Sequence, residues 1–300
     1  MKLAITGATG FVGSTLIDHA LEQGHAVNAL TRRDQAPRKG VTWVRGDLAN
    51  HAALAALCDG CDAAIHVAGV VNAPDRAGFQ AGNIAGTRAM VDAANAAEVP
   101  RFVHVSSLAA REPALSDYGW SKAGAEGEAA QATNCLIVRP PAIYGPRDTE
   151  MFELFRAAKS GIVPLPPRGR ASMIHVGDLA RLLLTLAVEG AQAGAIYEAD
   201  DGHDNGWSHE EIARMIGAAM GRRIVPLHVP RALLTFAARA DRALRGNKAK
   251  LTPDRASYMC HPDWTAHADR HPPASLWQAR IPTPDGLKQT ADWYRAEGWL

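Results

Sequence analysis

The first half of the chain alternates short, almost wholly apolar runs with segments in which apolar residues recur every three or four positions. Apolar runs of this kind are typical of strands that are buried on both faces, and the longer spacing is typical of helices. The alternation predicts an α/β fold, in which a doubly wound parallel sheet is covered by helices. We expect strands at Lys2 to Thr6, His25 to Thr31, Thr42 to Arg45, Ala63 to Val67, Arg101 to Ser106 and Asn134 to Arg139, and helices at Val12 to Gln23, His51 to Leu57, Gly78 to Ala97 and Asp117 to Ala132.

The pattern changes after Arg139, where prolines interrupt the chain and longer helical patterns with few strands follow. We therefore expect a sheet domain over residues 1–165 and a smaller, mostly helical C-terminal substrate lobe over residues 166–300, parts of which interleave with the sheet. Ser208-His209-Glu210-Glu211 is a capping-box pattern that opens a helix ending near Met220. Pro230 then begins a helix from Arg231 to Arg245 that mixes leucine, phenylalanine and alanine with arginine. Either a half-buried helix of the lobe or a membrane-surface helix fits this mixture, and we expect the first.

Composition and charge argue against a nucleic-acid-binding protein and against a membrane-spanning one. The chain has 300 residues, is 47% hydrophobic and has a formal net charge of +1, so no basic excess favours nucleic acid as a partner. No apolar run approaches the ~20 residues of a membrane-spanning helix, and glycine at position 7 comes too early for a signal peptide. We expect a cytoplasmic protein without a membrane span. Among the four cysteines only Cys58 and Cys61 are close in sequence, and without a second ligand pair we expect no metal site.

A glycine-rich turn, Gly7-Ala8-Thr9-Gly10-Phe11-Val12-Gly13, lies directly after the first apolar strand and at the start of a helix. Gly7 permits a sharp turn, Gly10 lets backbone approach a pyrophosphate, and Gly13 allows close helix packing. The free N–H groups of the helix start and the helix dipole favour the anion. This context predicts a dinucleotide site made by Gly7, Thr9, Gly10, Phe11, Val12 and Gly13.

The end of the second expected strand bears on which dinucleotide binds. A site selective for NAD usually places a carboxylate there for the ribose 2′-hydroxyl, whereas a 2′-phosphate calls for guanidinium groups. Here Thr31 stands in that place and is followed by Arg32 and Arg33. The pattern predicts NADP(H), with NAD(H) as the alternative because Asp34 is close in sequence.

A serine, a tyrosine and a lysine supply candidate chemistry. Tyr118 and Lys122 lie one turn apart in an expected helix and so project from the same face. A phenol with a pKa of ~10 is a poor acid or base at neutral pH, but a neighbouring ammonium favours the phenolate. Tyr118 would then exchange a proton with a carbonyl or alcohol oxygen while hydride is transferred, and Ser107 would donate a hydrogen bond to that oxygen.

These motifs resemble the short-chain dehydrogenase/reductase superfamily in its extended, epimerase/dehydratase-like branch, which implies a Rossmann sheet. The resemblance implies that Ser107 rather than Ser106 is catalytic, that Lys122 also holds the nicotinamide ribose, and that Asn83 supports a proton-relay water. It implies further cofactor contacts at Asp47, Leu48, Val67, Ala68, Gly69, Pro140, Ala142 and Ile143. The matching segments follow in family order: Thr6 to Gly13, Gly46 to Leu48, His66 to Gly69, Asn83 to Thr87, Ser106-Ser107, Tyr118 to Lys122, Arg139 to Pro146 and His175 to Ala180.

One departure from the family pattern bears on the reaction. The loop between Ser107 and Tyr118 is shorter than in sugar-nucleotide epimerases and dehydratases, and no acidic residue follows Tyr118 directly. We therefore expect an NADP(H)-dependent oxidoreductase that transfers hydride between the nicotinamide and a small or medium carbonyl or alcohol. The alternatives are a nucleotide-sugar epimerase that retains NAD(P) and a non-catalytic NADPH-binding subunit or sensor.

Several features stay open at this point. Arg168, Arg170, His175 and Asp178 could be structural or lie near the substrate. The glycines at 124 and 127 interrupt an expected helix that in the family often pairs with a second copy. A homodimer or close packing within one chain explains them equally well.

Overall fold

The apolar runs form the strands of a seven-stranded, all-parallel sheet, whose order is β11-β6-β5-β4-β1-β2-β3. The chain winds outward from β1 in both directions, which is the doubly wound arrangement that the sequence predicts. The strands are β1 (Lys2–Thr6), β2 (Ala26–Thr31), β3 (Val41–Arg45), β4 (Ala63–His66), β5 (Phe102–Val105), β6 (Cys135–Val138) and β11 (Ile196–Tyr197). The last of these comes from the second half of the chain.

This computed structural model describes residues 1–246, 249 and 251–300, which form two compact units. Unit 1 holds the sheet and comprises Met1–Pro140, Leu179–Glu198 and Pro272–Trp277. Unit 2 comprises Pro141–Asp178, Ala199–His271 and Gln278–Leu300. The chain first leaves the sheet unit at Pro140 rather than near residue 165, and it returns to add β11 as an edge strand.

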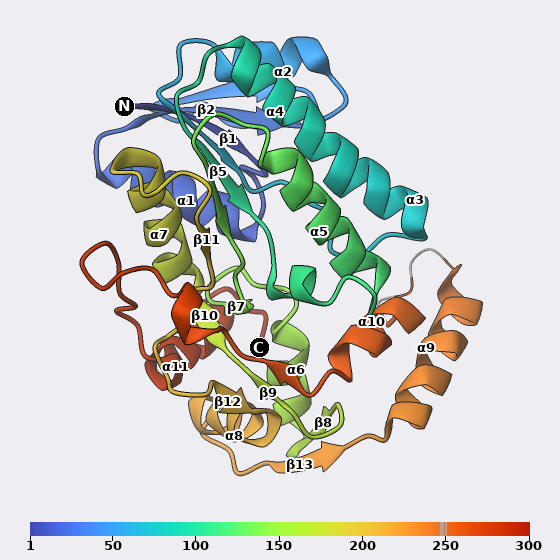
Figure 1. Cartoon of the computed structure of the whole chain (residues 1–300). Coiled ribbons are helices and arrows are strands. Elements are labelled where there is room, and N and C mark those ends of the chain that lie inside the picture. The colour runs from blue at the N-terminus through green and yellow to red at the C-terminus, as the bar shows by residue number, and fades with distance from the viewer. Residues whose placement is uncertain (247–248, 250) are drawn as a thin grey trace. The chain divides into compact units, whose positions relative to one another are not determined.

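Helices cover both faces of the sheet in unit 1. α4 and α5 lie on one face, and α1 and the part of α7 in this unit lie on the other (Figure 1). The core under α2, α4 and α5 includes Leu54, Leu57, Met90 and Phe102, all of which are buried. The helices are α1 (Phe11–Glu22), α2 (His51–Cys58), α3 (Arg76–Phe79), α4 (Gly86–Ala96), α5 (Asp117–Ala129) and α7 (Val176–Val188), with a short 3-10 turn at Leu108–Arg111.

The helix expected from Gly78 to Ala97 contains a π-helical turn, Gln80–Ala85, between α3 and α4. Such a turn inserts an extra residue into the helical ladder and is often found at functional sites. It carries the buried Asn83.

Unit 2 combines helices with small sheets of strands two to four residues long. Tyr144, Phe155, Leu287 and Tyr294 belong to its apolar core. The sheets pair β7 with β10, β8 with β13, and β9 with both β12 and β14. The elements are β7 (Ala142–Tyr144), α6 (Phe152–Ala158), β8 (Ile162–Leu165), β9 (Arg170–Ala171), β10 (Met173–His175), β12 (Trp207–Ser208), α8 (His209–Ala219), β13 (Val225–His228), α9 (Arg231–Arg245), α10 (Pro253–Met259), β14 (Asp263–Trp264), a 3-10 turn at Ala268–Arg270 and α11 (Thr283–Ala296).

The helix starts of unit 2 follow the sequence signals closely. Ser208 caps α8, and both bonds of the predicted capping box form, since the Ser208 hydroxyl accepts from the Glu211 N–H and the Glu211 carboxylate accepts from the Ser208 N–H. Pro230 is the residue just before α9 rather than its first helical residue.

Within the described part of the chain, no helix has the length and apolar character needed to cross a membrane. The expected cytoplasmic location stays a prediction.

Candidate active site

The glycine turn joins β1 to α1 with a geometry that requires glycine at two positions. Gly7 has a φ of +67°, and a Cβ there would lie 2.7 Å from the Ala68 nitrogen. A Cβ on Gly13 would lie 2.1 Å from the carbonyl oxygen of Gly7. Gly10 precedes α1 without a side-chain cap, so the first N–H groups of the helix face outward. A cradle of bare backbone at a helix start fits the pyrophosphate of a dinucleotide.

The ends of β2 and β3 carry the residues that bear on cofactor choice. The buried Thr31 hydroxyl donates to the Arg33 carbonyl at 2.7 Å and accepts from the Arg33 N–H at 3.2 Å, which fixes the turn after β2. Asp34 is paired with Arg45 of β3. Arg32 and Arg33 are exposed, and no ion pair between described residues involves either guanidinium. The carboxylate that follows in the sequence is thus paired, while the guanidinium groups of Arg32 and Arg33 are exposed.

α5 carries Tyr118 and Lys122, and its start is held against the turn that follows Ser107. Ser116 caps the helix by accepting from the Gly119 N–H at 2.9 Å. A Cβ on Gly119 would lie 2.7 Å from the Ala109 carbonyl oxygen, so glycine next to Tyr118 lets these two segments approach closely. The Tyr118 ring packs near Phe79, with ring centroids 6.1 Å apart.

Lys122 is buried and holds the end of β5. Its Nζ donates to the Val105 carbonyl oxygen at 2.8 Å. Burial lowers the pKa of Lys122 to about 8, an effect that the carboxylate of Glu126 partly offsets. A Cβ on Gly69 would lie 3.7 Å from this Nζ and 3.2 Å from Oδ1 of Asn83. Gly69, Asn83 and Lys122 therefore converge at one place in unit 1.

Asn83 links the loop after β4 to α5. Its Oδ1 accepts from the Val70 N–H at 2.6 Å, and its Nδ2 donates to the Val70 carbonyl at 3.0 Å and to Oγ of Ser121 at 2.8 Å. Ser121 in turn donates to the Tyr118 carbonyl at 2.8 Å. The side chain thus positions the helix turn that holds Tyr118 and Lys122. Its expected support of a relay water stays a prediction.

The two adjacent serines have different environments. Oγ of Ser107 is half-buried and caps the short turn after β5 by accepting from the Ala109 N–H at 3.2 Å. Oγ of Ser106 is buried and donates to Oε1 of Glu126 at 2.5 Å. The hydroxyl of Ser106 is therefore engaged in the interior, and the catalytic role of Ser107 stays a prediction.

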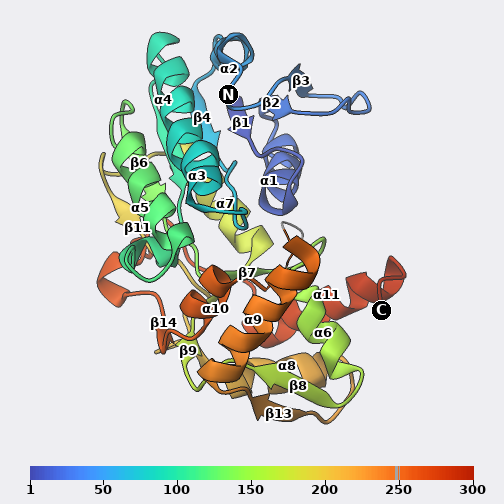
Figure 2. The ribbon, with the colours of Figure 1, turned by 90° about the vertical axis from the view of Figure 1, so that its right-hand side faces the viewer.

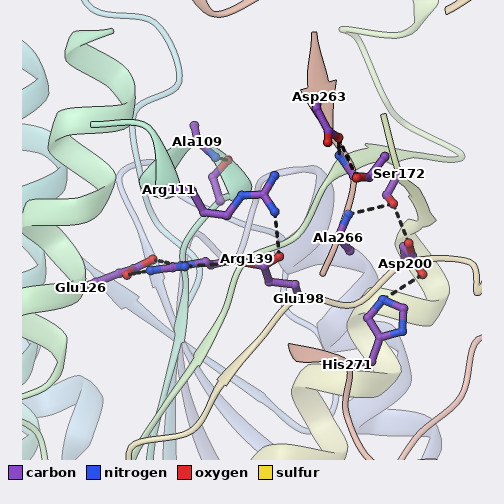
Figure 3. A network of polar contacts seen from close by, with 12 residues as sticks. Ala109, Arg111, Glu126, Arg139, Ser172, Glu198, Asp200, Asp263, Ala266 and His271 are labelled. Atoms are coloured by element: carbon purple, nitrogen blue, oxygen red, sulfur yellow. Dashed lines mark hydrogen bonds and ion pairs between the residues drawn. The ribbon is translucent and has the colours of Figure 1, made fainter. Parts of the chain in front are cut away.

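A chain of ion pairs between buried glutamates and half-buried arginines begins on α5, and the sequence did not reveal it (Figure 3). Arg139 donates to both carboxylate oxygens of Glu126, at 2.8 and 2.7 Å, and Nη1 of Arg139 lies 3.5 Å from Glu198. Nη1 of Arg111 donates to the other oxygen of Glu198 at 3.0 Å. Glu126 lies one turn beyond Lys122, a spacing that could have pointed to it. The network ties α5 to the ends of β6 and β11.

A row of buried polar side chains crosses the central strands. His66 lies within 2.7 Å of the Thr6 hydroxyl and 3.1 Å of the Thr87 hydroxyl, and it stacks on His104 with ring centroids 5.5 Å apart. Burial first, and the charge of Lys122 second, lower the pKa of His66 to about 3. The same causes, together with His66, hold the pKa of His104 well below its ordinary value. Both rings are therefore neutral at physiological pH.

The remaining predicted cofactor residues lie near these elements or begin unit 2. Val67, Ala68 and Gly69 follow β4, and the exposed Asp47 accepts from the Ala49 N–H at 2.9 Å. Leu48 packs against Gly86, where a Cβ would lie 2.6 Å from it. Pro140 accepts from the Leu108 N–H at 3.2 Å. Ala142 and Ile143 pair with β10 in unit 2, and their part in cofactor binding stays a prediction.

The residues left open by the sequence mostly have structural contacts. Arg170 donates to the carbonyls of Asn205 and Gly206, each at 2.7 Å, so it fixes a loop. Asp178 accepts from the N–H groups of Arg280 and Ile281 and so holds the approach to α11. The remaining two differ in environment: the ring of His175 packs edge-to-face on Tyr144, and Arg168 is exposed, 3.9 Å from Glu210.

Other expectations from the sequence concern thiols, metals and helix packing. Among described residues, no group of histidine, cysteine or acidic side chains could hold a metal ion. Cys58 and Cys61 are free, buried thiols whose pKa values are raised by burial. A Cβ on Gly124 would lie 2.6 Å from Ile84, so packing within the chain explains that glycine, whereas one on Gly127 would meet open space. The homodimer stays a prediction.

With this geometry in place, comparison with known proteins decides the family. Residues 3–199 match the model of the NAD dependent epimerase/dehydratase family. The chain belongs to this family. It is therefore an NAD(P)-dependent oxidoreductase of the extended short-chain dehydrogenase/reductase group, and its family binds nicotinamide cofactors.

Reductases are among the curated relatives of the chain. The chain is 40% identical over 309 aligned residues to a ceramide reductase of Caulobacter vibrioides, covering 99% of this chain and 96% of that protein. It is 30% identical over 230 residues to a 4-hydroxy-2-methyl-3-oxo-4-farnesyl-3,4-dihydroquinoline-1-oxide ketoreductase of Stigmatella aurantiaca, covering 67% and 69%. Among solved structures, gox2253 has a TM-score of 0.79 at 23% identity, covering 100% and 99%. MoeE5 in complex with UDP-glucose and NAD has a TM-score of 0.78 at 23% identity, covering 99% of each chain. These structural likenesses establish the shared Rossmann fold alone.

Proposed function

We propose that the protein is an NADP(H)-dependent reductase that converts a ketone or aldehyde group of an apolar, lipid-like molecule to an alcohol. The observation that carries the proposal is the placement of Ser107, Tyr118 and Lys122. All three belong to the turn after β5 or to α5, and Gly119 holds these two segments together. Lys122 anchors the helix to the end of β5.

The preference for NADP(H) is supported by the surface after β2. A 2′-phosphate on the adenine ribose needs positive charge, which the free guanidinium groups of Arg32 and Arg33 supply. A site for NAD would need an available carboxylate, but Asp34 is engaged by Arg45. Charge at this turn therefore favours the phosphorylated cofactor.

The bound cofactor would supply the hydride from C4 of its nicotinamide. Tyr118 would give its phenolic proton to the carbonyl oxygen, so that hydride and proton together convert the carbonyl to an alcohol. Ser107 would donate a hydrogen bond to the same oxygen and stabilise its developing charge. The ammonium of Lys122 would favour the resulting phenolate of Tyr118 until a proton from solvent restores it.

The relatives support the substrate class. The ceramide reductase is similar over nearly the whole of both chains, including the residues of unit 2. The ketoreductase is named for a farnesyl-bearing substrate, and a third relative, 28% identical over 304 residues, is a 2-alkyl-3-oxoalkanoate reductase of Stenotrophomonas maltophilia. Each name joins a reductase activity to an apolar chain. Our proposal thus extends the expectation of a small or medium carbonyl to a lipid-like one.

A nucleotide-sugar epimerase remains the competing function, since a UDP-glucose 4-epimerase of Vibrio cholerae is 26% identical over 261 residues. The residues directly after Tyr118 are Gly119 and Trp120, and the lack of an acid there argues against a dehydratase, which eliminates water from its sugar. The segment between Ser107 and Tyr118 is also short, and its turn at Leu108–Arg111 packs on α5. This short segment favours a reductase over a sugar-nucleotide epimerase.

The test is to follow NADPH absorbance with a panel of long-chain 3-ketones carrying an amide, short aldehydes, and UDP-glucose. We expect oxidation of NADPH with the long-chain ketones, and the alcohol as product by mass spectrometry. Conversion of UDP-glucose to UDP-galactose without net cofactor consumption, and no reaction with any ketone, would establish the epimerase instead.

A further inference from the structure

Helix α9 turns its apolar face away from the rest of unit 2. Leu233, Phe236 and Leu244 are 58%, 71% and 85% exposed. With Ala240, they recur at intervals of three and four residues and so share one side of the helix. The fully buried residue of α9, Ala238, lies on the opposite side. Figure 2 shows α9 on the near side of unit 2.

The helix that bears this apolar face is basic. Arg231, Arg239 and Arg245 are exposed and Arg242 is half-buried. Arg239, three residues after Phe236, lies beside the apolar face, whereas the other three arginines, four or seven residues from Ala238, lie toward the side of Ala238. The one acidic residue of α9, Asp241, lies 3.2 Å from Arg245 and accepts from the Leu251 N–H. The helix therefore has a net positive charge. An ordinary surface helix shows the reverse arrangement, with its apolar stripe facing the core.

A second surface of unit 2 repeats this combination. In the two-stranded sheet of β8 and β13, the paired residues Ile162 and Val225 are both exposed, and so are Pro164 and Leu227, which form another pair. Alternation along the strands places these four apolar side chains on one face of the sheet. Arg222 and Arg223, which come just before β13, are also exposed. Two residues, Val229 and Pro230, join this sheet to α9.

We propose that α9 docks unit 2 on an anionic lipid bilayer. Leu233, Phe236 and Leu244 would enter the boundary between headgroups and acyl chains, and Arg239 beside them would contact lipid phosphates. Large apolar side chains on one side of a helix and arginines on its other sides are features of interfacial helices. Arginine can extend its aliphatic stem along apolar surface while its guanidinium reaches the headgroups. The positive charge of the helix selects an anionic surface in particular.

The test is co-sedimentation of the full chain with vesicles of phosphatidylcholine alone and with vesicles that also contain phosphatidylglycerol. We expect binding to the anionic vesicles, weakened by salt and much reduced on phosphatidylcholine. Phe236→Ser should weaken binding by about tenfold or more because it removes an inserted aromatic ring. Arg239→Glu should weaken it by at least about fivefold, since each basic residue contributes about that factor and the variant adds a negative charge.

Matched controls keep the test specific. Lys288→Glu makes a similar change of charge at an exposed position of α11, and Val71→Ser removes an exposed apolar side chain from unit 1. Both should bind vesicles as the unmodified chain does. Circular dichroism and NADPH titration would establish that each variant is folded.

The competing occupant of this face is a second copy of the chain. Sedimentation velocity would detect it, because Phe236→Ser would then convert a dimer to a monomer. That result, combined with no vesicle binding by the unmodified chain, would overturn the proposal. Equal binding by Phe236→Ser, Arg239→Glu and the two controls would also overturn it.

Discussion

The Nζ of Lys122 donates a hydrogen bond to the carbonyl oxygen of Val105 at 2.8 Å. This bond joins the middle of α5 to the last residue of β5, immediately before Ser106 and Ser107. The buried ammonium thereby fixes the helix that carries Tyr118 relative to the strand that leads into Ser107. The same burial lowers the pKa of Lys122 to about 8, which brings its titration near the working range of an enzyme.

This pKa predicts the alkaline side of the pH profile. We expect kcat/KM for carbonyl reduction to fall above about pH 8, because the neutral amine no longer favours the phenolate of Tyr118. In Lys122→Arg the guanidinium stays charged, so the fall should move to higher pH even though turnover is reduced. Steady-state kinetics across the pH range test this. An unchanged alkaline limb in the arginine variant would assign the titration to another group.

Cofactor preference should depend on Arg32 and Arg33. The double variant Arg32→Ala/Arg33→Ala should bind NADPH about tenfold or more weakly, since a hydrogen bond to a charged group contributes about 1.5–3 kcal/mol. Its affinity for NADH should change little. Arg38→Ala is the control, because Arg38 is also an exposed arginine but pairs with Asp18. Fluorescence titration with both cofactors gives the comparison, and tighter binding of NADH than NADPH by the unmodified protein would contradict the assignment.

The ion pair between Glu126 and Arg139 should stabilise the fold. Glu126→Gln leaves the half-buried Arg139 without its bidentate partner, and we expect a loss of about 3 kcal/mol in the free energy of unfolding. Glu128→Gln makes the same chemical change two residues later, where Glu128 pairs with the exposed Arg88, and should cost under about 1 kcal/mol. Urea denaturation measures both. Equal losses of unfolding free energy in the two variants would show that the Glu126–Arg139 pair stabilises the fold no more than the exposed Glu128–Arg88 pair.

The buried histidines predict sensitivity to acid. Their pKa values are lower in the folded protein than in the unfolded chain, so the unfolded chain binds more protons once the pH falls below about 6.5. Stability should therefore be complete above that pH and decline toward pH 3, by up to about 1.4 kcal/mol per pH unit for each histidine. His104→Leu should show a shallower decline. Parallel pH dependence of the two proteins would show that His104 does not contribute.

Much of the fold could be predicted from local pattern. The strands around the glycine turn are buried on both faces, so their apolar runs are plain in the sequence, and Gly7 and Gly13 stand where backbone contact excludes a side chain. β11 has two residues and shows no pattern of its own. The π-helical turn at Asn83 also leaves no signal in the sequence, since one extra residue barely changes the spacing of apolar positions.

The features that could not be predicted depend on contacts between residues that are far apart in the sequence. Nothing near Arg139 or Glu198 in the sequence indicates that they share a buried network, because their partners are far away along the chain. The sequence leaves open whether Arg170 binds a ligand, but its guanidinium donates hydrogen bonds to the carbonyls of Asn205 and Gly206. The spacing in α9 predicts an amphipathic helix, yet only tertiary structure determines that the apolar side is the exposed one.

The central claim is that Tyr118 transfers a proton during NADPH-dependent reduction of a carbonyl. The most direct measurement compares Tyr118→Phe with the unmodified protein, by NADPH titration and by single-turnover reduction of a long-chain ketone that the unmodified protein accepts. We predict unchanged NADPH affinity and a rate reduced by about 10²- to 10⁴-fold, the usual contribution of general acid catalysis. Full turnover by a variant that binds NADPH normally would contradict the account.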